Sequence, residues 1–307
     1  MVTVWGSVTG HRLSVVEEGR AAARAAERLS GLGESRPRRK VADSQPGEPP
    51  ATSPRRAVRT PALAWLEMSK NDVASEQPTP RFQGVLLDWR GTLVTAPRYD
   101  LWVKTALQRI RRDAGAQAVD AVLTLLRSAD RSVVDSGIID TDVALHRTAY
   151  YSWFAAAGVD ALLADSLYAV ECDASMNPFA DDVELLLTTL HGAGTRIGIV
   201  SDIHFDLRPS FAERETEYGT KWIDLVDAWM LSYELGVCKP DPSIFAIALE
   251  RLRLSADQVL MVGDRAIPDG SAVAVGITSL LLPQLREVTE LRLHRVLDLV
   301  TPGWSSA

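Results

Sequence analysis

The sequence GVLLDWRGTL at residues 84–93 decides the fold class of this chain. Its first four residues are Gly and apolar side chains, and they end at Asp88, which a Gly91-Thr92 turn soon follows. A short apolar run bounded by turn residues is typical of a strand buried in a parallel sheet. Open α/β sheets bind ligands at the carboxyl ends of their strands. The stretch therefore predicts a buried strand that delivers a carboxylate to a functional loop.

From residue 82 onward, short apolar runs alternate with amphipathic segments. This alternation predicts an α/β fold, a Rossmann-like parallel sheet flanked by helices. Residues 286–300 are predicted as a terminal helix, because apolar residues recur along them after the last strand. The predicted strands are Gln83–Asp88, Arg196–Ser201, Ala228–Ser232, Val259–Gly263 and Ser279–Leu282.

Between the first two predicted strands the apolar pattern is helical. Trp102, Val103, Ala106, Leu107 and Ile110 share one helical face. Two more faces are predicted there, formed by Val119, Val122, Leu123 and Leu126, and by Val159, Leu162, Leu163, Leu167 and Val170. We therefore predict an inserted α-helical cap subdomain at residues 98–177, with the α/β core at 81–97 and 178–307. Asn177-Pro178 marks the return to the core, since a helix rarely continues into the residue before proline.

The composition changes near residue 80. Residues 33–61 are rich in proline and in basic residues, and they hold few large apolar side chains. Such a segment buries too little surface to offset the entropy of ordering, so residues 1–80 are predicted to be a disordered basic leader, with a short marginal helix at 11–30. Two alternatives stay open. The basic cluster could bind nucleic acid or a partner, or translation could begin at Met68.

Composition and charge limit the function classes. The chain has 307 residues, of which 46% are hydrophobic and 24% charged, as in ordinary globular proteins. It has no run of the roughly 18 apolar residues that a membrane span requires. With two cysteines there is no disulfide framework, so a reducing cytoplasm is expected. Residues 1–67 carry 11 Lys/Arg and 7 Asp/Glu, a net of +4, which leaves −11 for the rest. This acidic body argues against nucleic-acid binding.

Chemically active side chains follow four of the predicted strands. Each one alone is commonly a turn or helix-cap residue. Together they supply a carboxylate nucleophile, a hydroxyl donor, a cation and a further acidic pair to the carboxyl edge of one sheet, which predicts an active site there. These residues are Asp88, Ser201, Asp202, Lys239, Asp264 and Asp269.

Four motifs carry a family resemblance: VLLDWRGTLV, IGIVSD, CKPDPSIF and MVGDRAIPDG, in this order. Over residues 82–282 the chain resembles the haloacid dehalogenase superfamily of hydrolases, and the helical insert after the first motif is similar to that family's cap of the first type. The resemblance implies a Mg²⁺ cofactor, a small phosphorylated substrate and an aspartyl-phosphate intermediate. It implies Asp88 as nucleophile and metal ligand, Asp264 and Asp269 as metal-site acids, Thr92 and Ser201 near the phosphate, and Lys239 as the catalytic cation that stabilises it. Asp202, next to Ser201, and Arg90, two residues after Asp88, are also predicted to bind the phosphate.

Arg90 departs from the family pattern, because phosphatases of this family usually carry an acid–base Asp at this position. A guanidinium cannot serve as a general base. Three hypotheses about the function stay open. In the first, the protein is a phosphatase in which Arg90 clamps the phosphate and another group activates water. In the second it hydrolyses C–P or C–halogen bonds, and in the third it binds phosphate without turnover. The candidate water activators are Asp202, Asp100 and His146.

We predict the first of these functions, a Mg²⁺-dependent hydrolase of a small phosphorylated metabolite in which the cap selects the substrate. The retained acids Asp264 and Asp269 disfavour the halogen branch, which needs no metal. The C–P branch uses a cap lysine, and Lys104 is a poor match for it. Trp89 is predicted to pack in the core or at the hinge rather than to form an aromatic lid.

Overall fold

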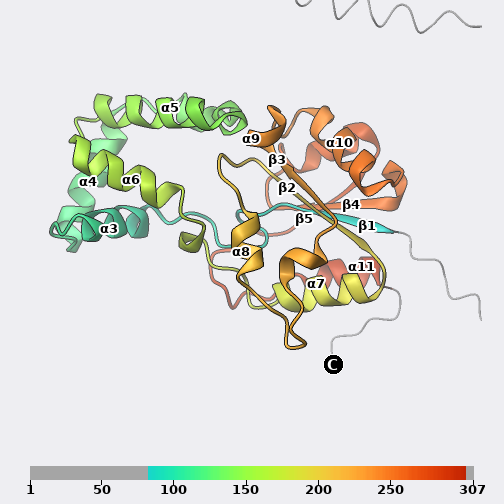
Figure 1. The fold of residues 1–307 in the computed structure, drawn as a ribbon. Coiled ribbons are helices and arrows are strands. Elements are labelled where there is room, and N and C mark those ends of the chain that lie inside the picture. Colours follow the sequence, from blue (N-terminus) through green and yellow to red (C-terminus); the bar gives the residue numbers. More distant parts are fainter. Residues whose placement is uncertain (1–81, 302–307) are drawn as a thin grey trace, which may run out of the picture. The chain divides into compact units, whose positions relative to one another are not determined.

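The computed structural model describes residues 82–301, shown as the coloured ribbon in Figure 1. The predictions for a disordered leader, a helix at 11–30 and a start at Met68 lie outside these residues. A five-stranded, fully parallel sheet organises the described chain, in the order β3-β2-β1-β4-β5. Its strands are β1 Gly84–Leu87, β2 Arg196–Ser201, β3 Ala228–Leu231, β4 Val259–Gly263 and β5 Thr278–Leu281.

The strand predictions are confirmed with small shifts. β2 and β4 have the predicted bounds, whereas β5 begins and ends one residue earlier. β1 lies at the centre of the sheet, where Leu87 pairs with Ile199 of β2 and with Val262 of β4. The α/β fold class is therefore confirmed. A central strand buried on both faces explains why residues 84–87 are apolar without alternation.

Helices cover both faces of the sheet (Figure 1). Val85 and Leu87 of β1 belong to one hydrophobic cluster, together with residues of α7 (Val183–Gly192) and α11 (His294–Val300). Leu86 points to the opposite cluster, which contains residues of α10 (Pro242–Leu252) and of the short 3₁₀ helix η6 (Gly270–Val275). The period-two alternation of a strand thus divides three successive side chains between two cores.

Short elements complete the core. Asp241 caps α10 through its carboxylate, which accepts the backbone N–H of Ser243, and Pro242 occupies the first turn, where its missing N–H costs nothing. The remaining core elements are α8 Arg208–Ala212, η4 Trp222–Leu225, α9 Ser232–Leu235 and η5 Ala256–Gln258.

Between β1 and β2 the described chain contains helices and no strand, as predicted. We call residues 99–176 the helical insert. It comprises α3 Tyr99–Arg109, α4 Ala116–Ser128, η1 Val134–Ser136, η2 Ile138–Thr141, α5 Val143–Ala156, α6 Ala161–Glu171 and η3 Ala174–Met176. It has its own hydrophobic cluster, which includes Val103, Phe154 and Leu167. The exact boundaries of the cap stay a prediction. One predicted face is wrong in part, because Leu162 is 56% exposed.

The predicted terminal helix at residues 286–300 is wrong in its first half, because α11 begins only at His294. Tertiary hydrogen bonds hold the preceding segment in a non-helical path. The backbone N–H of Leu285 donates to the carbonyl of Gly91, and the N–H groups of Arg292 and Leu293 donate to the Asp182 carboxylate. Local periodicity does not reveal such long-range partners.

Trp89 packs in the core, as predicted. It is fully buried in the hydrophobic cluster under α7 and meets Phe205 edge to face, with ring centroids 6.0 Å apart. Within residues 82–301, no helix has both the length and the apolar character needed to cross a membrane.

Candidate active site

Asp88 lies directly after β1, where a tight loop holds it. Its backbone N–H donates to Val262 across the sheet at 2.9 Å, and its side chain is buried. The loop then turns sharply at Gly91, which has a positive φ of 86°. The Thr92 hydroxyl donates to Asp88 Oδ2 at 3.2 Å. The Gly-Thr pair of the motif thus closes the turn and fixes one oxygen of the Asp88 carboxylate.

Lys239 is the central cation of the site. Its Nζ donates to Asp88 Oδ1 and to Asp269 Oδ1, both at 2.6 Å, and to the carbonyl of Val200 at 3.2 Å. The ammonium group is fully buried. Three acceptors satisfy all three of its N–H groups, so a charge that would be costly to bury alone is fully paired.

The two residues at the end of β2 have different positions. Ser201 is the last residue of the strand and is buried. Asp202 holds the loop of Lys239: its Oδ1 accepts the backbone N–H of Lys239 at 2.8 Å, and its Oδ2 accepts the Arg265 guanidinium at 3.0 Å. Both carboxylate oxygens of Asp202 therefore already accept hydrogen bonds, and Asp202 holds the loop that carries Lys239 in place.

Three carboxylates converge beside this lysine. One oxygen from each of Asp88, Asp264 and Asp269 lies within 4.8 Å of the others. Asp264 Oδ2 accepts the side-chain amide of Gln284 at 3.0 Å, whereas its Oδ1 is buried without a hydrogen-bond partner in the described chain. A set of oxygen ligands with one unpartnered buried oxygen fits a hard divalent cation such as Mg²⁺.

Gly263, at the end of β4, allows this convergence. A Cβ atom at this position would lie 2.2 Å from the carboxyl carbon of Asp269, closer than any real contact. Asp269 can approach the strand only because the side chain is missing. Its Oδ2 then accepts the backbone N–H of Arg265 at 2.8 Å, which fixes the carboxylate beside Lys239.

The charges shift the ionisation of the site. Burial raises the pKa of Asp88 to about 6, and the neighbouring Asp269 carboxylate adds to this, while Lys239 opposes it. Burial likewise raises the pKa of Asp264. Burial alone would lower the pKa of Lys239, but Asp88, Asp202 and Asp269 outweigh it and raise that pKa. Lys239 therefore stays charged. A further cation bound beside Asp88 and Asp264 would stabilise the ionised form of both carboxylates.

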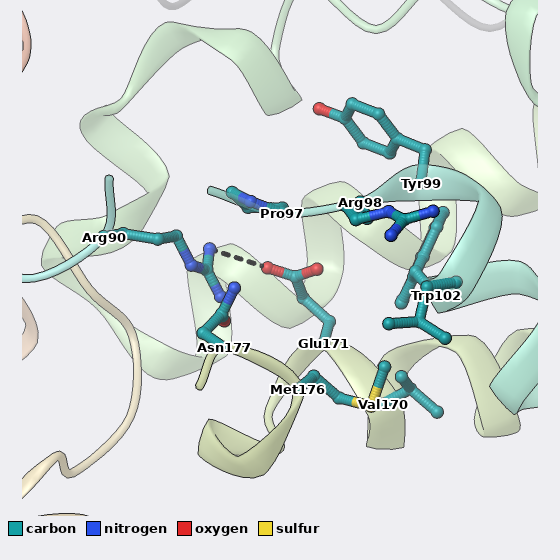
Figure 2. Close-up of a pocket in the computed structure, with 10 residues that line it drawn as sticks. Arg90, Pro97, Arg98, Tyr99, Trp102, Val170, Glu171, Met176 and Asn177 are labelled. Atoms are coloured by element: carbon teal, nitrogen blue, oxygen red, sulfur yellow. Dashed lines mark hydrogen bonds and ion pairs between the residues drawn. The ribbon is translucent and has the colours of Figure 1, made fainter. Parts of the chain in front are cut away.

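Arg90 points away from this cluster. Its Nη1 donates to Glu171 Oε1 at 3.1 Å, an ion pair between the loop after β1 and the end of α6 (Figure 2). The guanidinium also lies over the ring of Trp89, 5.7 Å from the centroid. The carboxylates of Glu171 and Asp140 raise the pKa of Arg90 against the effect of burial. The structure does not bring Arg90 together with the other predicted phosphate ligands.

The other candidate water activators also lie apart from Asp88 in the described chain. Asp100 is exposed and pairs with Arg98 at 3.0 Å. His146 is buried against Asp140 in the helical insert. Lys104, weighed as a cap lysine, is exposed on α3.

Sequence reasoning missed three polar residues of the site. Arg265 lies beside the acids, and Asp88, Asp202 and Asp269 all raise its pKa against the effect of burial. Its place directly after Asp264 in the fourth motif was a usable signal. Gln284 binds Asp264, and Arg292 donates to the carbonyl of Thr92 at 2.6 Å. Neither of these belongs to a motif, so the sequence held no comparable signal for them.

This geometry coincides with a family match. A sequence profile of haloacid dehalogenase-like hydrolases matches residues 82–275, which include Asp88, Lys239 and both further acids. The chain belongs to the haloacid dehalogenase-like hydrolases. The family resemblance of the four motifs is therefore confirmed. A search of curated proteins found no match.

Several solved structures are similar to this chain. A dehalogenase is 20% identical, covering 71% of this chain and 97% of its own, with a TM-score of 0.50. The 2-haloacid dehalogenase of Pseudomonas syringae pv. Tomato DC3000 is 20% identical over 65% of this chain and 86% of its own, with a TM-score of 0.46. An enzyme of the same superfamily from Bacteroides thetaiotaomicron, in complex with magnesium and inorganic phosphate, is 18% identical over 67% and 96%, with a TM-score of 0.43. At 20% identity, the likeness to the first of these structures shows the fold alone.

Proposed function

We propose that this haloacid dehalogenase-like hydrolase is a Mg²⁺-dependent phosphatase of a small phosphorylated metabolite and acts through an aspartyl-phosphate on Asp88. One observation carries the proposal: three carboxylates converge at the strand ends beside a buried lysine, and one of their buried oxygens, Asp264 Oδ1, has no hydrogen-bond partner in the described chain. A metal-free reaction at Asp88 gives no reason to gather two further acids there.

Asp88, Asp264 and Asp269 would hold the metal. A bound Mg²⁺ supplies positive charge that offsets the repulsion between the phosphoryl oxygens and the Asp88 carboxylate. Lys239 contributes positive charge as well, because its ammonium group is 2.6 Å from Asp88 Oδ1. Thr92 orients the second oxygen of Asp88 through its hydroxyl.

The proposed reaction has two steps. An oxygen of Asp88 forms a bond to phosphorus while the bond from phosphorus to the leaving oxygen breaks. Water then cleaves the aspartyl-phosphate, which releases inorganic phosphate and regenerates Asp88. The hydroxyl of Ser201, at the end of β2, would supply a hydrogen-bond donor for a phosphoryl oxygen.

Arg90 narrows the substrate class. A guanidinium does not give up a proton in a protein, so it cannot protonate the leaving group. The leaving group must then depart as an anion, which favours aryl and acyl phosphates over alkyl phosphates. We therefore propose a phosphorylated metabolite whose leaving group is a weak base.

Arg90 also supports a second candidate, a dehalogenase. Attack of Asp88 on a carbon that carries a halogen displaces halide, which needs no proton, so an acid at position 90 is unnecessary. The two candidates share the nucleophile and differ in the metal. Phosphate transfer at this site depends on Mg²⁺, and halide displacement does not.

One experiment separates the two candidates. Release of phosphate from an aryl phosphate and of halide from a 2-chloro acid are measured with Mg²⁺ or with EDTA, for the wild type and for Asp88→Asn. We expect phosphate release only from the wild type with Mg²⁺. Halide release that persists in EDTA, without phosphate release, would establish the dehalogenase. Circular dichroism of D88N serves as the folding control, and no turnover of either substrate would reject both enzymes.

A further inference from the structure

A second group of metal-ligand side chains lies where the helical insert meets the core. Asp140 comes from η2, His146 from α5, and His204 from the loop after β2. One ligand atom from each lies within 4.8 Å of the others. The group shares no residue with the carboxylates around Asp88.

Both imidazoles direct one nitrogen at the same carboxylate oxygen. His204 Nδ1 lies 3.4 Å from Asp140 Oδ1, and His146 Nε2 lies 3.8 Å from it. The second distance is too long for a hydrogen bond. Two ligand atoms that each lie about 2.1 Å from a tetrahedral ion are about 3.4 Å apart, so this spacing is close to that of ligands around one metal.

The second ring nitrogen of each histidine, which faces away from Asp140, lies near a polar side chain. His146 Nδ1 lies 3.2 Å from the Tyr168 hydroxyl, and His204 Nε2 lies 3.6 Å from Cys172 Sγ. Histidines that bind metals usually have their second nitrogen held in this way, which fixes the tautomer and the orientation of the ring. The two rings are stacked, with centroids 3.3 Å apart and planes 10° apart, so one ring has to rotate before both nitrogens can point at one ion.

Burial keeps both histidines in the ligating form. Each side chain is about 2% exposed or less, and burial lowers the pKa of His146 and of His204 to about 3, with Arg90 contributing in the same direction. Both rings are therefore neutral near pH 7, and no proton has to leave before a cation binds. Asp140 is 24% exposed, which leaves an approach from solvent.

We propose that Asp140, His146 and His204 form a second metal site, for a transition metal of the Zn²⁺ class. Two imidazoles and one carboxylate suit Zn²⁺, whereas the oxygen-only set around Asp88 suits Mg²⁺. Three protein ligands leave a fourth position for water or for a substrate group. This inference is independent of the proposed phosphatase.

The site would tie the helical insert to the core. Asp140 and His146 belong to the insert, whereas His204 follows Ser201 and Asp202 on the loop after β2. The carbonyl of Asp140 also accepts the Ser232 hydroxyl at 2.7 Å, so the two parts already meet here. A bound ion would add bonds across this contact and hold the insert over the strand ends.

Calorimetric titration of the full chain with Zn²⁺, in excess Mg²⁺ to saturate the carboxylate site, tests the proposal. We expect one tight site in the wild type. His146→Gln and His204→Gln should each lower the Zn²⁺ affinity by more than about tenfold. Loss of a residue that only supports a metal ligand already lowers metal affinity by at least about tenfold. His191→Gln, at an exposed histidine of α7, is the matched control and should bind like the wild type. Asp264→Asn should also leave Zn²⁺ binding unchanged.

Two results would overturn the proposal. One is unchanged Zn²⁺ affinity in both H146Q and H204Q; the other is loss of the site in D264N instead. If the histidine variants do not fold, Asp140→Asn is the deciding variant, because it keeps both histidines. Unchanged Zn²⁺ affinity in D140N would also reject the site. Visible absorption of the Co²⁺-loaded protein is a second readout. We expect the intense bands of tetrahedral Co²⁺ in the wild type, H191Q and D264N, and their loss in H146Q and H204Q.

Discussion

At the scale of single residues, Arg90 sets the chemical character of this site. It stands two positions after Asp88, the proposed nucleophile, and its guanidinium can neither donate nor accept a proton at physiological pH. Burial opposes its charge, but the Glu171 carboxylate outweighs this effect and raises its pKa. The side chain therefore joins the first loop to α6 and takes no part in the carboxylate cluster of Asp88. A small cavity of about 30 Å³ lies beside this ion pair, and its lining includes Arg90, Tyr99, Glu171 and Asn177 (Figure 2).

Restoring an acid at position 90 should accelerate hydrolysis of poor substrates. Arg90→Asp alone would leave Glu171 beside a second carboxylate, so it is combined with Glu171→Gln. We expect R90D/E171Q to hydrolyse an alkyl phosphate at least about tenfold faster than the wild type, because general acid catalysis contributes about 10²–10⁴-fold. The aryl phosphate should gain little, since its leaving group needs no proton. Initial rates with both substrates provide the measurement.

E171Q alone is the matched control for this double variant. It loses the same ion pair without gaining an acid, so its rate on the alkyl phosphate should not rise. A double variant that is no faster than E171Q would show that the missing acid is not what limits the rate.

At the scale of elements, the ends of β1, β2 and β4 bring the site together. Parallel strands place their carboxyl ends at one edge, so residues far apart in sequence meet there. Close approach at this edge depends on glycine. A Cβ at Gly91 would lie 2.5 Å from Asp264 Oδ2, and one at Gly263 would lie 2.2 Å from the Asp269 carboxyl carbon.

Gly263→Ala should therefore damage the proposed metal site more than the fold. The added methyl group forces Asp269 away from Lys239, and overpacking of this kind costs about 1–3 kcal/mol of stability. We expect the Mg²⁺ concentration for half-maximal activity to rise at least about tenfold, as for the loss of support to a metal ligand. Mg²⁺ titration of the rate and urea unfolding measure the two effects.

Gly270→Ala provides the comparison for G263A. It lies one residue after Asp269, and a Cβ there meets no atom within 4 Å. G270A should keep the Mg²⁺ dependence of the wild type. Equal effects of the two substitutions would mean that the crowding of Asp269 is not the cause.

At the scale of the whole described chain, contacts between the helical insert and the core govern pH stability. His146 and His204 have their pKa lowered from 6.5 to about 3 by burial. In the unfolded chain they take up protons near pH 6.5, whereas in the folded protein they stay neutral. The stability that they contribute is therefore present above pH 6.5, and it is lost as the pH falls from there toward 3.

In chelator-treated protein, the free energy of unfolding should fall below pH 6.5 by up to about 1.4 kcal/mol per pH unit for each histidine. Urea unfolding of the wild type and of H146Q/H204Q at a series of pH values measures this. The difference between the two slopes isolates the histidines together with Asp140, whose pKa His146 lowers, because Asp88 and the acids away from the two rings titrate equally in both proteins. Identical slopes would contradict the assignment of neutral, buried rings.

Deletion of residues 1–67 should leave catalysis unchanged. The family match begins at residue 82, and every residue of the candidate site lies between Asp88 and Arg292. The specific activity and the thermal unfolding of the shortened chain are compared with those of the full chain. Loss of activity or of solubility would show that the leader contributes to the folded enzyme.

Much of the fold was predictable because its signals are local. Apolar runs such as residues 84–87, bounded by turn residues, predict strands buried on both faces, because neither face of such a strand needs polar side chains. The order of the motifs then predicted that Asp88, Lys239, Asp264 and Asp269 meet at one edge, and these four do lie together. Their catalytic roles stay a proposal.

By itself the sequence determined the α/β fold, the helical nature of the insert and the residues at the strand ends, because periodicity and turn chemistry act over a few residues. Only the tertiary structure decided that Arg90 pairs with Glu171, that Asp202 holds the lysine loop, that residues 285–293 run outside a helix, and that two histidines face Asp140. Each of these depends on how segments distant in the chain pack together. Local patterns carry no record of that packing, because the partner of a buried polar group is chosen by proximity in space.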